Sequence, residues 1–145
     1  MSQPTDDEIK SFVAHQCAMW NDHDRQGYLD AWKAIAPNGI TFEDPVGTPP
    51  KAGWDMWLKM WDQFNKFSVE QRVDFLSLRG DEVALLIYHH AEYAGEATET
   101  FDIEVWKFVD GMAHVRCWWN PPSSATHAAS LEGYSAAGGR DPATA

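Results

Sequence analysis

The sequence predicts an α+β fold in which three N-terminal helices pack on a curved, mostly antiparallel sheet. Apolar residues recur at the spacing of one helical face over residues 6–64. From residue 67 the pattern changes to β-rich segments that are separated by turn signals. Helices followed by strands, rather than alternating with them, favour a layer of helices on an antiparallel sheet. The length of 145 residues fits one domain.

The first helix is predicted over residues 6–21. Thr5 and Glu8 have the spacing of a capping box, in which each side chain bonds to a free backbone N–H at the helix start. The apolar residues that follow lie at i, i+3, i+4, i+8 and i+11, and therefore on one face: Ile9, Phe12, Val13, Cys17 and Trp20.

Two more helices and a short strand follow in order. The second helix carries an apolar face and ends at Pro37-Asn38-Gly39, because proline and glycine stop helices. Residues 40–43 are a β-type run and form the first predicted strand. Gly53 opens the third helix, whose apolar residues lie on one stripe: Trp54, Trp57, Leu58, Trp61 and Phe64.

Four strands are predicted in the second half, over residues 67–78, 82–93, 97–109 and 112–119. Arg79-Gly80-Asp81 and Asp110-Gly111 are hairpin turn signals between them. The folded domain is predicted to span residues 1–122. Alanine, serine, glycine and proline dominate afterwards, so residues 123–145 are predicted to be a C-terminal tail, either mobile or lying over a partner subunit.

The charge and the cysteine content exclude several classes of function. The net charge is −11, from 22 acidic and 11 basic residues, which argues against nucleic acid and anionic membrane surfaces as partners. No apolar run reaches transmembrane length, and the start lacks the basic and apolar segments of a signal peptide. The two cysteines have no metal-ligand spacing and form no disulfide framework. We expect a cytoplasmic protein without a metal or a cofactor.

Asp44 is the leading candidate for a catalytic residue. The strand ends in Glu43 and Asp44, and a Pro-Val-Gly-Thr-Pro-Pro loop follows at once. Proline fixes its own φ and restricts the residue before it, so Asp44 is held at a stiff strand end. A carboxylate fixed beside apolar neighbours is how a general base is positioned. The alternative is an ordinary turn, because aspartate before proline is common turn chemistry.

The segment from Gly27 to Trp61 resembles the ketosteroid isomerase branch of the SnoaL-like, or NTF2-like, superfamily. The shared pattern is a helix, a strand that ends in Glu-Asp-Pro-x-Gly, two prolines, and a glycine that opens the next helix. The resemblance implies a cone-shaped fold with the substrate pocket between the sheet and the helices. It also implies that Asp44 is the general base.

The resemblance places a second acid, Glu104, in the pocket, where the family usually has aspartate. Because successive strand residues face opposite sides, the neighbours that point inward follow by alternation. His89 is then a polar residue on an apolar face. One possibility is that His89 donates a hydrogen bond to the substrate or carries a proton for it. The other is that it is a core histidine bonded to a carbonyl group. The predicted catalytic residues are Asp44, Glu104 and His89, and the predicted substrate-binding residues are Gln16, Trp20, Trp61, Ile87, Trp106, Cys117 and Trp119.

The first helix departs from the family because it contains no tyrosine to donate to the substrate oxygen. Gln16 or Cys17 occupies the matching position, and His15, Gln16 and Trp20 are the donors available on this helix. The two supporting tyrosines of the family are replaced by Ala36 and Trp61. The group that replaces the missing tyrosine is therefore left open by the sequence.

The resemblance predicts an enzyme, and it leaves the reaction open. The first hypothesis is a cofactor-independent isomerase or lyase that acts on a hydrophobic, ring-bearing substrate. The alternatives are a lyase or dehydratase of lignin-derived aromatic dimers, of the formaldehyde-lyase type, or a non-catalytic NTF2-like domain for small-ligand binding or dimerisation. A homodimer is expected in each case, because the apolar residues Tyr88, Ile103, Val105 and Trp118 point away from the pocket.

Overall fold

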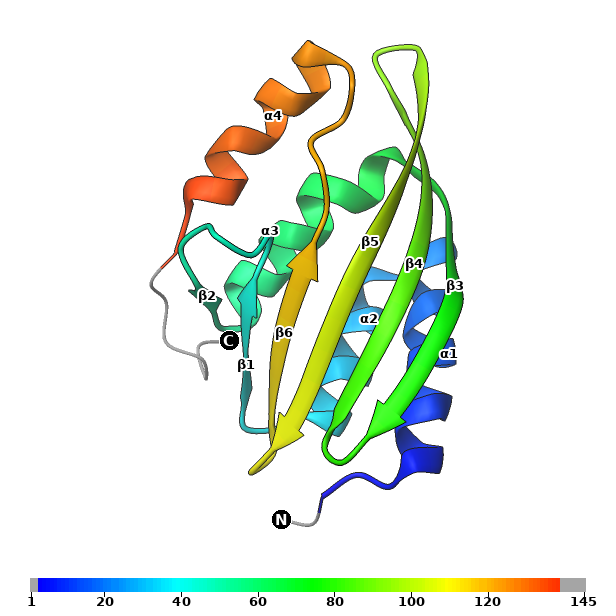
Figure 1. Ribbon diagram of the computed structural model, residues 1–145, viewed down its shortest axis with the longest axis vertical. Coiled ribbons are helices and arrows are strands. Elements are labelled where there is room, and N and C mark those ends of the chain that lie inside the picture. Colours follow the sequence, from blue (N-terminus) through cyan, green and yellow to red (C-terminus); the bar gives the residue numbers. More distant parts are fainter. Residues whose placement is uncertain (1–2, 139–145) are drawn as a thin grey trace.

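The computed structural model describes residues 3–138, which form a layer of helices on one face of a twisted sheet (Figure 1). The helices of that layer are α1 (Asp6–Asn21), α2 (Arg25–Ile35) and α3 (Trp54–Phe64), and a 3₁₀ turn, η1 (Asn65–Phe67), follows. The strands are β1 (Gly39–Glu43), β2 (Lys51–Ala52), β3 (Ser68–Arg79), β4 (Glu82–Tyr93), β5 (Glu96–Val109) and β6 (Met112–Trp118). The predicted α+β fold is confirmed.

The sheet has the strand order β2-β1-β6-β5-β4-β3, and only the β1–β6 pair is parallel. Asp110 and Gly111 have φ values of 53° and 73° and make the turn between β5 and β6, as predicted. Register shifts in β3 between Ser68 and Glu70, and again between Val73 and Phe75, mark bulges. Because bulges bend a strand and increase its twist, they curve this side of the sheet over the helices.

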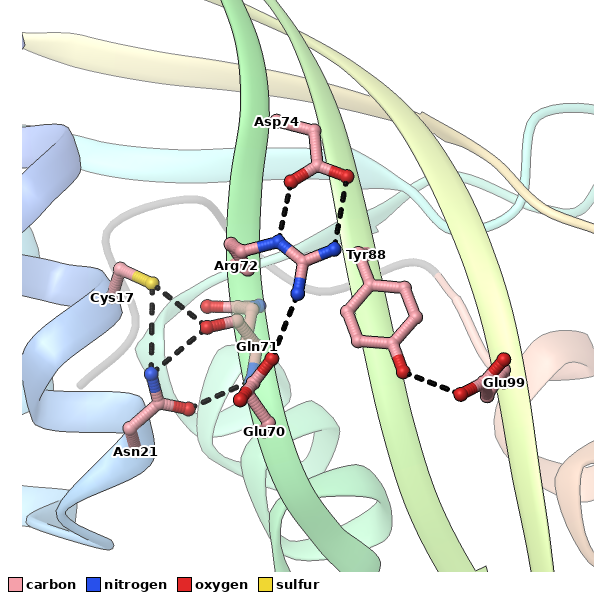
Figure 2. Close-up of polar contacts among 8 residues, drawn as sticks. All are labelled: Cys17, Asn21, Glu70, Gln71, Arg72, Asp74, Tyr88 and Glu99. Atoms are coloured by element: carbon pink, nitrogen blue, oxygen red, sulfur yellow. Dashed lines mark hydrogen bonds and ion pairs between the residues drawn. The ribbon is translucent and has the colours of Figure 1, made fainter.

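The local signals in the sequence account for the helix ends. Helix α1 has the predicted bounds, and the Thr5 side chain accepts a hydrogen bond from the Glu8 backbone N–H at 3.1 Å. Gly53 precedes α3 with φ 94°, a conformation that glycine adopts without steric cost. At the end of α1, Asn21 donates to the carbonyl of Gln71 at 2.9 Å and accepts from its N–H at 2.8 Å (Figure 2), which fixes α1 to β3.

Aromatic side chains fill the space between the helices and the inner face of the sheet. Trp32 is fully buried, and its ring lies 4.7 Å from Phe12, 4.9 Å from Trp57 and 4.8 Å from Trp106, measured between centroids. These edge-to-face contacts join α1, α2, α3 and β5 in one core. The many tryptophans therefore serve packing as well as the pocket wall.

The prediction of a tail from residue 123 is wrong for residues 125–136, which form helix α4 (Ala125–Ala136). In Figure 1, α4 follows β6 and runs down toward the loop that joins β1 and β2. Three of its side chains, at i, i+4 and i+7, are buried against the same chain: His127, Leu131 and Tyr134. Ser124 caps its first turn by accepting from the His127 N–H at 3.3 Å. Residues 139–145 of the predicted tail lie outside the described residues.

No helix in residues 3–138 is both long enough and apolar enough to span a membrane.

Candidate active site

A pocket lies between the inner face of the sheet and the helices, and α4 closes part of it. Strands β4, β5 and β6 supply one wall, α1, α2 and α3 the other, and His127 and Leu131 of α4 contribute to its rim. Its aromatic residues are Trp20, Tyr28, Trp32, Trp57, Phe64, Phe67, Trp106 and Trp119. Neither lysine nor arginine is among the described residues that line it, whereas Asp44, Asp102 and Glu104 are, so the pocket disfavours anionic ligands.

Asp44 lies in this pocket, at the end of β1, with 6% of its surface exposed. The Trp119 indole N–H donates to Asp44 Oδ1 at 2.6 Å, and the Tyr134 hydroxyl donates to Oδ2. Burial raises the pKa of Asp44 by more than the hydrogen bonds from Tyr134 and Trp119 lower it, so the net shift is upward. The two donors therefore stabilise the charged form of a carboxylate that has almost no contact with water.

Tyr134 was missed by the sequence analysis because it lies in the predicted tail. Its hydroxyl reaches Asp44 because α4 packs beside β2, where Lys51 is fully buried. The Lys51 ammonium lies 4.9 Å from the centroid of the Tyr134 ring and donates to the Ser135 carbonyl at 3.2 Å. The spacing of His127, Leu131 and Tyr134 was the one signal in the sequence that indicated a buried helix face here.

Glu104 of β5 is the second acid in the pocket, and it accepts a hydrogen bond from the Trp106 indole at 2.9 Å. Burial raises the pKa of Glu104 to about 8, and the negative charge of Asp102 contributes further. The basic residues that might have neutralised it are engaged elsewhere. Arg116 pairs with Glu43 at 2.9 Å, and Lys107 lies 4.0 Å from Asp81. A pKa of about 8 favours the neutral form of Glu104 at pH 7.

His89 does not donate to a backbone carbonyl as a core histidine would. Its Nε2 atom lies 2.9 Å from Asp102 Oδ2, and both side chains are largely buried. Burial lowers the pKa of His89, but the charge and the hydrogen bond of Asp102 raise it by more, so the net shift is upward. The upward shift favours the protonated imidazole, which can deliver a proton to a bound molecule.

His89, Asp102 and Glu104 are also the described residues whose spacing would suit a metal ion. Their ligand atoms all lie within 4.8 Å of one another. One imidazole and two carboxylates are a common donor set for transition metals. The expectation that the protein needs no metal remains a prediction.

The remaining predicted residues occupy different places. Gln16 and Trp20 line the pocket, but their donors are engaged: Gln16 Nε2 bonds to the Val13 carbonyl at 3.0 Å, and Trp20 Nε1 to Ser68 Oγ at 2.9 Å. Trp61 does not line the pocket, because its ring packs behind the wall. Ile87, Trp106, Cys117 and Trp119 all lie in the pocket wall.

Cys117 is not a nucleophile in this setting. Burial raises the pKa of its thiol well above the ordinary value, and the charge of Glu104 acts in the same direction. The thiol therefore stays protonated, and its place in the wall is that of a small apolar side chain.

The fold is shared with solved structures of several proteins. The SalBIII protein, an epoxide hydrolase/cyclase-like enzyme in pyran ring formation of the polyether salinomycin, matches with a TM-score of 0.66 at 18% identity, over 79% of this chain and 93% of that one. RV0760c from Mycobacterium tuberculosis matches with a TM-score of 0.65 at 19% identity, over 81% and 95%. A candidate SnoaL-like polyketide cyclase from Jannaschia sp. CCS1 matches with a TM-score of 0.63 at 13% identity, over 83% and 90%.

These likenesses identify the fold as SnoaL-like, in the NTF2-like class. No known family model matches the sequence, and no curated protein matches it. At these identities the structural likenesses define the architecture and leave the reaction to be argued from the site.

Proposed function

We propose that the protein is an enzyme that moves a proton on a hydrophobic, ring-bearing substrate, with Asp44 as the general base. The observation that carries the proposal is the contrast between two buried carboxyl groups in one aromatic pocket. Asp44 accepts two hydrogen bonds that favour its charged form, whereas burial and the charge of Asp102 raise the pKa of Glu104 to about 8 and so favour its neutral form. Two acids that are held in opposite protonation states can act as base and donor in one reaction.

The chemistry needs no group beyond these side chains. Asp44 removes a proton from a carbon beside a carbonyl group, the electron pair of the broken C–H bond forms a C=C bond, and the π pair of the carbonyl group moves to its oxygen. Glu104 donates a hydrogen bond to that oxygen as its charge develops. Return of the proton to a different carbon gives an isomer. Expulsion of a leaving group gives the product of a lyase.

A lyase or dehydratase is the second candidate, and the pair of His89 and Asp102 favours it. Loss of a hydroxyl group requires a proton donor for the departing oxygen. The imidazole of His89, held by Asp102 at 2.9 Å and raised in pKa, supplies such a donor in the same pocket. An isomerase expels no group and therefore needs no proton donor for a departing oxygen.

The test of the proposal is deuterium exchange of 2-tetralone, a flat ketone with acidic protons beside its carbonyl group. The exchange is followed by proton NMR in deuterated buffer, so it reports proton removal whether the natural reaction is isomerisation or elimination. We expect the wild-type protein to accelerate exchange. A wild-type rate equal to that of buffer alone would contradict the proposal and favour a non-catalytic binding domain.

The exchange rate is expected to fall as the pH rises through about 8. Glu104 is neutral below its pKa, so its donor is present at pH 6–7 and is lost as the group ionises. This decline on the alkaline side is measured by a pH profile of the exchange rate constant. The Glu104→Gln variant keeps an N–H donor at every pH, and its profile should lack the decline. If the wild-type protein and Glu104→Gln show the same decline, a group other than Glu104 causes it.

Tyr134 is expected to act as a positioning residue for Asp44. Tyr134→Phe removes the hydroxyl that lowers the pKa of Asp44, so this pKa should rise and the acid limb of the rate profile should move to higher pH. Tyr88→Phe is the matched control, because the Tyr88 hydroxyl bonds to Glu99, away from the pocket. If the acid side of the rate profile is unchanged in Tyr134→Phe, Tyr134 does not set the pKa of Asp44.

The outer face of the sheet is proposed to join two copies of the chain. Ile103, Phe101 and Phe75 are more than half exposed there, and Trp118 is 37% exposed. Arg72 lies beside them, bonded to Asp74 and Glu70, with its guanidinium 4.3 Å from the centroid of the Tyr88 ring (Figure 2). An apolar face of this kind is typical of a subunit interface. Sedimentation should show a dimer at micromolar concentration, and a monomer would contradict this.

A further inference from the structure

One buried amide oxygen in the pocket wall has no hydrogen-bond partner among residues 3–138. It is Oε1 of Gln71, a residue of β3 that is 8% exposed and lines the pocket. The other buried side-chain atoms without a partner in this part of the chain are nitrogens, of Trp32, Trp57 and His127. Most buried polar groups in proteins are hydrogen-bonded, so an unpaired acceptor in a pocket calls for an explanation.

The direction of the Gln71 side chain follows from its neighbours on β3. Glu70 and Arg72 are exposed and pair with each other on the outer face of the sheet, with Arg72 Nη1 3.0 Å from Glu70 Oε1. Because successive strand residues face opposite sides, Gln71 points inward. Helix α1 fixes its backbone, since the N–H donates to Asn21 at 2.8 Å and the carbonyl accepts from Asn21 at 2.9 Å and from the Cys17 thiol at 3.4 Å (Figure 2).

His89 is the direct cross-strand partner of Gln71 on this inner face. The two residues are opposite each other in the register of β3 and β4, which places their Cβ atoms about 4.5–5.5 Å apart. His89 bonds to Asp102 through Nε2 at 2.9 Å, so Nδ1 is the ring nitrogen left for a ligand. The upward shift in the pKa of His89 favours the protonated ring, in which Nδ1 also carries a proton. An acceptor and a donor therefore lie side by side without bonding to each other.

We propose that Gln71 and His89 form a second polar subsite of the pocket, which binds a hydroxyl group of the substrate. A hydroxyl group satisfies both side chains, because its O–H donates to the amide oxygen and its lone pair accepts from the imidazole N–H. A ketone or an ether has no proton to donate, so the subsite selects against both. This assignment rests on the proposed function, and it names the class of substrate that the same pocket takes.

The subsite continues the row of polar groups that includes Glu104. The ligand atoms of His89, Asp102 and Glu104 all lie within 4.8 Å of one another, and Gln71 extends the row by one strand. The sheet side of the pocket is therefore polar across β3, β4 and β5, whereas the facing helices supply aromatic rings. The substrate class is a flat ring system that carries one oxygen near Glu104 and a separate hydroxyl group at Gln71.

The experiment compares the binding of 2-naphthol, naphthalene-2,6-diol and 6-methoxy-2-naphthol by calorimetric titration. The wild-type protein should bind the diol about tenfold more tightly than 2-naphthol, the usual effect of a buried hydrogen bond, and should gain nothing from the ether. Gln71→Met keeps the size of the side chain and removes the acceptor. It should bind 2-naphthol normally and reduce the gain from the diol to about twofold, the statistical advantage of two equivalent hydroxyl groups.

Gln26→Met is the matched control, because Gln26 is exposed on α2 and its amide bonds to Asp30 at 2.8 Å. This variant should keep the tenfold gain. Thermal unfolding gives a second readout that needs no ligand. Gln71→Met should melt at or above the wild-type temperature, because it removes an unpaired buried acceptor. A marked fall in melting temperature would show that the amide has a partner in the free protein, and would overturn the proposal.

The binding data overturn the proposal in any of four cases. These are a wild-type protein that binds none of the three compounds, no gain from the diol, an equal gain from the methyl ether, and a tenfold gain that survives in Gln71→Met. Because no turnover is measured, failure here is distinct from failure of Asp44 as the base, which the deuterium exchange of 2-tetralone tests.

Discussion

Asp44→Asn is expected to slow deuterium exchange of 2-tetralone by about 10²- to 10⁴-fold, the usual cost of losing a general base. Asparagine has the shape of aspartate but cannot accept the proton. The fold should persist, since the amide oxygen can accept from the Trp119 indole and the amide nitrogen can donate to the Tyr134 oxygen in place of Oδ2. Thermal unfolding of the variant checks this point.

Glu43→Gln is the matched control for Asp44→Asn. It makes the same chemical change one residue earlier on β1, where the side chain pairs with Arg116 outside the pocket. Its exchange rate should equal that of the wild-type protein. Near-full activity of Asp44→Asn would show that another group removes the proton.

Glu104→Ala is expected to lower the exchange rate by about 10²- to 10³-fold, comparable to the loss of one donor to a developing negative charge. Glu104→Gln should retain much of the rate at pH 7, because its amide donates a hydrogen bond as the neutral acid does. Equal losses in both variants would indicate that the volume of the side chain, and not its donor, matters. A full rate in Glu104→Ala would remove Glu104 from the mechanism.

The sequence predicted those parts of the fold that depend on local signals. Helix α1 was placed correctly by two local signals, the capping pair Thr5 and Glu8 and the apolar face. Both signals act within a few residues of the chain. Once the family resemblance had placed one residue of each strand in the pocket, the alternation of strand residues indicated the inner face of β4, β5 and β6. It therefore placed Ile87, Trp106 and Cys117 in the wall of one pocket.

The contacts that α4 makes could not be predicted from local sequence. Its composition of small residues resembles that of a tail, and its stability comes from burying three side chains against distant parts of the chain. The bond from Tyr134 to Asp44 joins residues 90 positions apart. Such a contact can be identified only from the folded structure, in which α4 lies over the end of β1.

The apolar face predicted for the second helix includes Tyr28 and Trp32, and both residues line the pocket. Helical spacing places Tyr28 and Trp32 on the same side of α2. Both residues reach the pocket because of how α2 lies against α3 and the sheet, and periodicity holds no information about that.

The opposite protonation states of Asp44 and Glu104 are tested most directly by carbon-edited NMR of the side-chain carboxyls, with Asp44→Asn and Glu104→Gln used to assign the two signals. At pH 6–7 we expect the Asp44 carboxyl to be ionised and the Glu104 carboxyl to be protonated, with Glu104 titrating near pH 8. A Glu104 signal that is already ionised at pH 6, or an Asp44 signal that is still protonated at pH 7, would contradict the division of roles between base and donor.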